Sequence, residues 1–157
     1  MLRSCGQCQV CCFAPRLEEL DKPALTRCKF QGDGCCTEYD ARPSVCQSYQ
    51  CAWLGGFGQR AHRPDKLGAL LTARNSEALG PWVSVQVLTE GARASKAFKR
   101  AVASAAERCI VLEMLDSSMR VLGGPEEQVQ AFVEAGATSA TPIHRLVPLS
   151  ALTRRAS

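Results

Sequence analysis

The sequence lacks the features by which many enzymes are recognised. It has only two histidines in 157 residues, and aromatic residues make up 6% of the chain. It contains no P-loop, no HExxH pair, no convincing Ser/His/Asp set and no glycine-rich strand–turn–helix signal for a methyl donor. The sequence therefore leaves open whether the chain is an enzyme, and it favours a non-catalytic role.

Long hydrophobic runs are also missing. No apolar run reaches the roughly 18 residues that a membrane-spanning helix needs, and the first ten residues, MLRSCGQCQV, have no hydrophobic core of a secretory signal. We therefore expect no membrane association and a cytoplasmic location. In that reducing compartment, clustered cysteines are more often metal ligands than disulfides.

Large aliphatic residues are scarce in the first third of the chain, where cysteine is abundant. Nine of the ten cysteines lie between Cys5 and Cys51, and only Cys109 lies outside this window. Such a segment cannot bury enough apolar surface to fold by packing alone, so we expect disulfides or metal to hold it together.

The cysteine spacing favours metal over disulfides. Cys5, Cys8 and Cys11 recur every three residues, and a C-x2-C turn lets two thiolates point at one centre. A disulfide between such near neighbours would close a very short loop and stabilise the fold little. Cys11–Cys12 and Cys35–Cys36 are vicinal pairs, whose thiolates could serve two adjacent metals. A disulfide framework remains the alternative.

The formal net charge of +4 suggests nucleic acid as a partner, but metal would change that balance. Eight bound thiolates would add about eight negative charges, and two divalent ions would return about four positive ones. A loaded chain would then be near neutrality, so nucleic acid is an unlikely partner. An interaction module is a further alternative, with Lys96, Lys99 and Arg100 facing an unknown protein or RNA. A simple exposed helix surface is the favoured interpretation of these three residues.

From residue 67 onward, cysteine almost disappears and aliphatic periodicity begins. Patterning predicts strands at 67–73, 82–88, 109–115 and 119–123, and helices at 95–108 and 125–136. The predicted fold class is therefore α+β. An irregular, metal-stapled cysteine-rich segment (1–66) packs on a body (67–157) with a small antiparallel sheet and two helices. One integrated domain is the alternative to two separate parts.

Two cysteine motifs together resemble a known family. The run CGQCQVCC (5–12), the run CTEYDARPSVC (36–46), Cys51 and the RPDK at 63–66 are similar to the YkgJ-like CxxCxxCC family, whose members are described as candidate zinc- or iron-chelating proteins. The resemblance covers residues 5–66. It implies that the metal ligands are Cys5, Cys8, Cys11, Cys12, Cys28, Cys36, Cys46 and Cys51.

Eight thiolates divide most simply into two four-thiolate sites. Soft sulfur ligands suit zinc, and iron or an iron–sulfur cluster is the alternative cofactor. Cys35 departs from the family pattern as an extra thiol, either spare or an alternate ligand. Cys109 is expected to be a buried structural cysteine.

Other residues near the cysteines could contribute to a cofactor site. Arg42 could donate hydrogen bonds to thiolate sulfur or offset cluster charge, with Tyr39 beside it, or it could form a surface ion pair with Asp40 or Glu38. Tyr49 and Trp53 are expected to pack over the site and exclude water. For His62, a solvated loop position is favoured over metal ligation.

Overall fold

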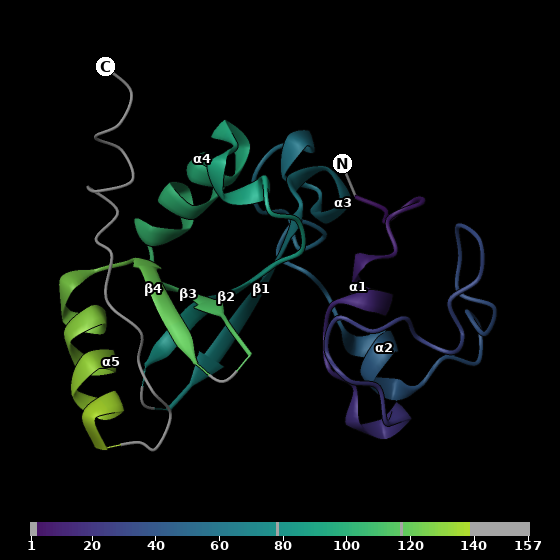
Figure 1. The fold of residues 1–157 in the computed structure, drawn as a ribbon, viewed down its shortest axis with the longest axis horizontal. Helices are drawn as coiled ribbons and strands as arrows, with labels where there is room; N and C mark the ends of the chain where they lie inside the picture. The colour runs from purple at the N-terminus through teal and green to yellow at the C-terminus, as the bar shows by residue number, and fades with distance from the viewer. Residues whose placement is uncertain (1–2, 78, 117, 139–157) are drawn as a thin grey trace.

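The computed structural model describes residues 3–77, 79–116 and 118–138, and consists of an irregular cysteine-rich part and a part built on one sheet (Figure 1). We call residues 3–66 the cysteine segment and residues 67–138 the body. The mixed α+β composition of the prediction is confirmed. No helix in the described part of the chain is long and apolar enough to cross a membrane.

The body is organised by a four-stranded sheet with the order β1-β2-β3-β4. The strands are β1 (Ala69–Ser76), β2 (Gly80–Val87), β3 (Ile110–Met114) and β4 (Met119–Gly123). The prediction of an antiparallel sheet is only partly right, because β2 and β3 pair in parallel while the two outer pairs are antiparallel. A parallel pair needs a crossover connection, and the helix between β2 and β3 supplies it.

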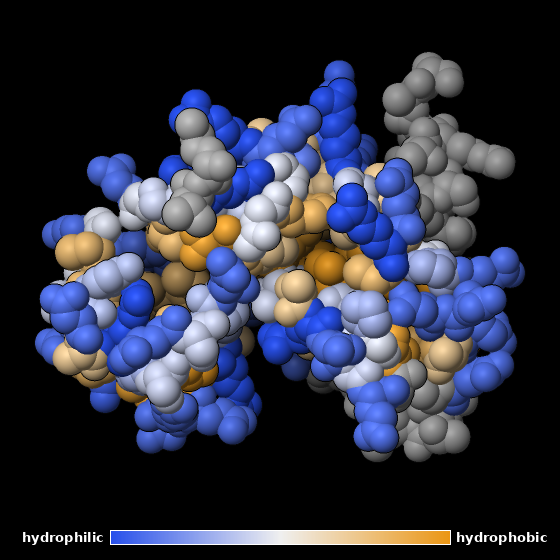
Figure 2. Space-filling view, turned by 180° about the vertical axis from the view of Figure 1, so that it is seen from behind, coloured by the Kyte–Doolittle hydropathy of each residue, from blue (hydrophilic) through white to orange (hydrophobic). Residues whose placement is uncertain are grey.

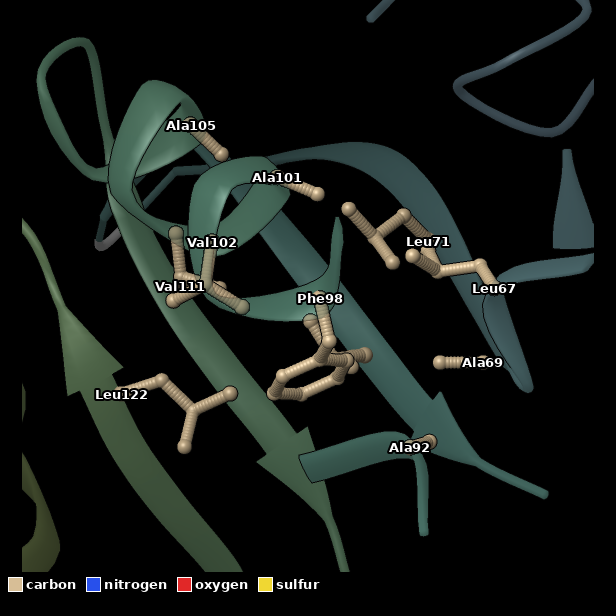
Figure 3. Packing of buried hydrophobic residues seen from close by; sticks show 11 residues of the cluster. Leu67, Ala69, Leu71, Ala92, Phe98, Ala101, Val102, Ala105, Val111 and Leu122 are labelled. Carbon is tan, nitrogen blue, oxygen red and sulfur yellow. The ribbon is translucent and has the colours of Figure 1, made fainter. Parts of the chain in front are cut away.

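Helix α4 (Lys96–Ala106) covers one face of the sheet after the short 3-10 helix η3 (Ala92–Ala94). Ser95 caps α4, because its Oγ accepts a hydrogen bond from the Phe98 backbone N–H at 3.1 Å. Phe98 and Val102 point from α4 towards Val111 and Leu122 (Figure 3). The opposite side of α4 exposes the basic residues Lys96, Lys99 and Arg100, as the sequence predicts.

Helix α5 (Glu126–Thr138) covers the other face over β3 and β4. Phe132 packs there against Ile110, Leu112 and Val121. The helix begins directly after Pro125 as predicted, but it continues two residues past Gly136, where the sequence predicts its end. Residues 139–157 lie outside the described residues.

The cysteine segment contains only short elements: α1 (Val10–Phe13), η1 (Glu18–Leu20), α2 (Ser44–Ser48), η2 (Arg60–His62) and α3 (Pro64–Leu67). It attaches to the sheet at β1, because the Ala52 N–H donates to the Leu71 carbonyl at 2.9 Å. Next to this bond, Cys51 and Trp53 pack against Leu70 and Ala14. Cys51 is therefore held at the junction with the sheet.

A buried carboxylate ties the end of β3 to its neighbours. Glu113 is fully buried, and Arg93 binds its Oε1 through Nε at 2.8 Å and through Nη2. Arg120 Nε lies 3.3 Å from Oε2 as an ion pair outside hydrogen-bond geometry. The two guanidinium groups compensate a charge that would otherwise be costly to bury.

We expect Glu113→Gln to lower the free energy of unfolding by about 2 kcal/mol, because it removes both ion pairs and leaves a buried amide. Urea unfolding of the full chain measures this. Glu107→Gln is the matched control, because Glu107 is exposed at the end of α4. Equal stability of the two variants would contradict a structural role for the Glu113 ion pairs.

Candidate metal centre

Four thiols gather around the turn that opens the cysteine segment. The Cys8 N–H donates to the Cys5 carbonyl at 3.0 Å, which closes the C-x2-C turn. Burial raises the pKa of Cys5 most, and the charges of Cys51, Cys8 and Cys12 raise it further. The pKa of Cys11 is raised too, first by its hydrogen bond to Cys12, then by burial, and then by neighbouring thiolates that include Cys5 and Cys8. We call Cys5, Cys8, Cys11 and Cys51 the first thiol group.

The other four thiols of the resemblance are joined by contacts of their own. The Cys28 N–H donates to the Cys12 carbonyl at 3.2 Å, and Cys36 pairs with Gln31 in an isolated β-bridge. Burial is again the largest cause of the raised pKa of Cys46, followed by the charges of Cys28, Cys12 and Cys36. We call Cys12, Cys28, Cys36 and Cys46 the second thiol group.

The vicinal pair Cys11–Cys12 joins the two groups. The Cys11 thiol donates to Cys12, and this hydrogen bond is the largest cause that lowers the pKa of Cys12 to about 7. Since the charge of Cys12 also raises the pKa of Cys5, the vicinal pair lies at the boundary between the two groups. The division of the eight thiols into four and four is therefore our interpretation of these neighbours.

The gathered thiols do not form a closed ligand set. Across residues 3–77, 79–116 and 118–138, no three or more Cys, His, Asp or Glu side chains are arranged so that they could hold a metal ion. All ten cysteines carry free thiols. The donor chemistry fits a soft metal, whereas the distances between the sulfur atoms would have to shorten around an ion.

A buried lysine lies beside the second thiol group, and nothing in the sequence pattern pointed to it. Lys22 is 5% exposed, and its Nζ donates to the carbonyls of Phe13 at 2.9 Å, Pro15 at 2.6 Å and Pro23 at 3.1 Å. Burial lowers its pKa, whereas the charges of Cys28, Cys12 and Cys46 act in the opposite direction. Its place in the short polar run 16–22 gives no sign of a buried cation.

An ion pair lies beside the first thiol group, whereas a buried lysine lies beside the second. Arg63 binds Asp65 through two hydrogen bonds of 2.6 Å. The hydrogen bond from Arg63 is the largest cause of the lowered pKa of Asp65, and a hydrogen bond from the Cys8 thiol lowers it further. Both residues belong to the RPDK motif, whose contact with Cys8 could not be inferred from spacing alone.

An open cavity of about 730 Å³ lies against the thiols, and Cys5, Cys8, Cys11, Cys36 and Cys46 contribute to its wall. The cysteine segment that holds it forms the left-hand lobe in Figure 2, with a largely hydrophilic surface. The cavity makes the thiol groups accessible from solvent.

Arg42 and Tyr39 also line the cavity. The Arg42 guanidinium stacks over the Tyr39 ring at 4.1 Å, within range of the charges of Cys36 and Cys46. Of the two interpretations of Arg42, the ion pair with Asp40 or Glu38 is wrong, because no salt bridge among the described residues includes Arg42. Its place beside the second thiol group fits the interpretation that Arg42 donates to thiolate sulfur or offsets the negative charge there.

The structure also bears on the predictions for Cys35, Cys109 and His62. Cys35 is exposed at the cavity, whereas Cys109 is buried near the end of α4, as expected for a structural cysteine. The prediction that His62 is solvated is wrong: His62 is 9% exposed, and its Nδ1 accepts the Gln59 N–H at 3.2 Å. The imidazole can lie against the backbone of its own loop because Gly58, at φ +73, has no Cβ; a Cβ there would clash with His62 Nδ1.

The two aromatic residues pack between the thiols and the sheet. Trp53 is 9% exposed and donates its Nε1–H to the Gln59 carbonyl at 2.9 Å. The Tyr49 hydroxyl lies 2.8 Å from Thr72 Oγ1 on β1. Burial is the main cause that raises the pKa of Tyr49 to about 12, and the charges of Cys51 and Cys11 add to it. These residues shield the first thiol group on the sheet side.

Comparisons of the chain with protein-family models, with curated proteins and with solved structures find no match. The resemblance to the YkgJ-like family therefore stays a prediction that rests on the spaced cysteines and the residues between them.

We expect Tyr49→Phe to lower the free energy of unfolding by about 1 kcal/mol, because it leaves the Thr72 hydroxyl without its partner. Tyr39→Phe is the control, because Tyr39 is 60% exposed and is the other of the two tyrosines. Denaturant unfolding of both variants tests this docking contact. A loss in the Tyr39 variant as large as in the Tyr49 variant would count against it.

Proposed function

We propose that this chain binds metal through eight cysteine thiolates in two four-thiolate sites, and that it has a structural or metal-handling role. The first thiol group would supply Cys5, Cys8, Cys11 and Cys51, and the second Cys12, Cys28, Cys36 and Cys46. Zinc is the cofactor that we propose first, because closed four-sulfur sites are typical of structural zinc.

The observation that supports the proposal is the convergence of eight thiols from three separated stretches of chain. Backbone hydrogen bonds bring Cys5 to Cys8, and Cys28 to Cys12. Cys51 is held by packing against Leu70 on the sheet. Thiols that raise one another's pKa resist simultaneous deprotonation, and a bound cation would remove that repulsion.

In such a site the metal would supply cross-links and positive charge, and the protein would orient the ligands and shield them from water. The short turns would orient the thiolates, Tyr49 and Trp53 would exclude water on the sheet side, and Arg42 with Tyr39 would face the site from the cavity. The soft donor set supports zinc or iron over magnesium or calcium.

An iron–sulfur centre, in a redox protein or a cluster-dependent enzyme, is the second candidate. The Cys5-x2-Cys8-x2-Cys11 spacing is also how ferredoxins hold three corners of a four-iron cluster. The open cavity of about 730 Å³ favours this candidate, because it would give a larger centre room and solvent access. The exposed basic side of α4 leaves an interaction module as a third candidate, with metal as its staple.

Thiol alkylation tests the metal-binding proposal. In protein purified without oxygen we expect iodoacetamide to modify Cys35 first, and the eight ligand thiols to react only after a strong chelator is added. Cys109 should react slowly with and without chelator, because it is buried. Peptide mass spectrometry reads each cysteine separately. Equal rates for the eight thiols before and after chelation would rule the proposal out.

A single substitution tests the division into two sites. Cys46→Ser should lower the metal content from about two ions per chain to about one, because it breaks one closed four-thiolate set. Cys109→Ser is the matched control and should keep both ions. Metal analysis after gel filtration gives the number, and an unchanged content in Cys46→Ser would contradict the assignment of Cys46 as a ligand.

A further inference from the structure

Lys22 presents a physical problem that the hydrogen bonds around it do not solve. An ammonium has three donors, and all three are used by the carbonyls of Phe13, Pro15 and Pro23. Carbonyls satisfy the hydrogen bonds but do not cancel the charge. No salt bridge among the described residues includes Lys22, and every Asp and Glu of the chain lies within those residues. A buried charge without a counter-charge is costly.

The fold turns the Lys22 ammonium towards the backbone that carries part of the second thiol group. Leu17 and Lys22 form an isolated antiparallel bridge, with Asp21 in the left-handed region at φ 48, so the chain reverses and turns the lysine inward. One of its acceptors is the carbonyl of Phe13, the residue that follows Cys12. The next turn brings Cys28 to the Cys12 carbonyl. The cation is thus tied to the backbone that carries two of the four thiols.

The first thiol group provides an internal contrast. Two guanidinium groups lie near it. Arg63 is paired with Asp65 over two bonds of 2.6 Å, so those two charges cancel locally. Arg3 is only half-buried and donates to the carbonyls of Trp53, Phe57 and Gly58. Arg42 lies near the second group but is half-buried at the wall of the open cavity, where it stacks on the Tyr39 ring and solvent still screens its charge. Lys22 is therefore the one buried cation beside either group, within the described residues, whose charge no carboxylate balances.

We propose that Lys22 is the counter-charge and positioning residue of the second thiol group, Cys12, Cys28, Cys36 and Cys46. Four thiolates around a divalent ion carry about two negative charges, and the buried ammonium offsets one of them. The two sites are then unequal, because among the described residues only the second has a buried cation beside it. This inference rests on the proposed metal binding, and it predicts which half of that binding fails when the charge is removed.

The test compares Lys22→Met with Lys22→Arg and with Lys29→Met. Lys29 is the matched control, because it lies in the same segment and is exposed. Zinc-loaded protein is titrated with a competing chelator, and alkylation with peptide mass spectrometry records which cysteines are released. Neighbours of metal ligands commonly contribute about 10- to 100-fold to metal affinity, so we expect Lys22→Met to weaken one of two zinc ions by that factor.

The released thiols in Lys22→Met should be those of the second group, while Cys5, Cys8, Cys11 and Cys51 stay protected. Lys22→Arg should retain most of the affinity because it keeps the charge, and Lys29→Met should bind like the wild type. Two results would overturn the inference: both zinc ions held as tightly as in the wild type, or both groups released together, which is the pattern of a purely structural lysine. Wild-type protein that takes up no zinc, iron or cobalt would instead show that the proposed function itself has failed.

Discussion

The structure depends on one constraint: the cysteine segment has too little apolar surface to fix its own conformation. Only six of its apolar residues are buried, and two of these are cysteines: Ala14, Leu17, Cys28, Cys51, Trp53 and Pro64. Its helices are at most five residues long, too short to be stable by themselves. Backbone hydrogen bonds, the Lys22 carbonyl contacts and the edge of β1 hold the segment in place. Further cross-linking at the thiols would therefore stabilise it most where packing contributes least.

The body provides what the cysteine segment lacks. Its two hydrophobic clusters cover both faces of the sheet, one under α4 and the other under α5. Strand β1 lies at the edge of the sheet, so its carbonyls are free to accept a bond from Ala52, and its Leu70 side chain packs against Cys51 and Trp53. The sheet thus anchors one thiol of the first group directly. The second group has no such support and relies on loops closed by Lys22.

Much of the fold could be predicted from sequence, because it depends on local periodicity. The alternation of Val83, Val85 and Val87 predicted β2, and the amphipathic run over 95–108 predicted α4, whereas its Ser95 cap was not predicted. The parallel pairing of β2 with β3 could not be predicted, because periodicity says nothing about which strands become neighbours. The end of α5 differed because Gly136 lowers helix propensity without stopping a helix.

The candidate site shows the same division between local and long-range information. The resemblance to the YkgJ-like family supplied the eight proposed ligands, and that assignment stays a prediction. Cysteine spacing could not show how Cys11 and Cys12 lie relative to the other thiols, because this depends on how the loops fold back. Nor could it reveal Lys22, whose burial follows from the reversal at Asp21, or the contact between Asp65 and Cys8 across the segment. Charge burial is a long-range property that residue type alone does not disclose.

The most direct test of the central claim is elemental analysis with a visible spectrum, on protein purified without oxygen. The account predicts about two zinc ions per colourless chain, or, for the iron–sulfur candidate, iron with matching acid-labile sulfide and absorption that bleaches on reduction. A chain that contains no zinc or iron and still keeps its native fold would contradict it.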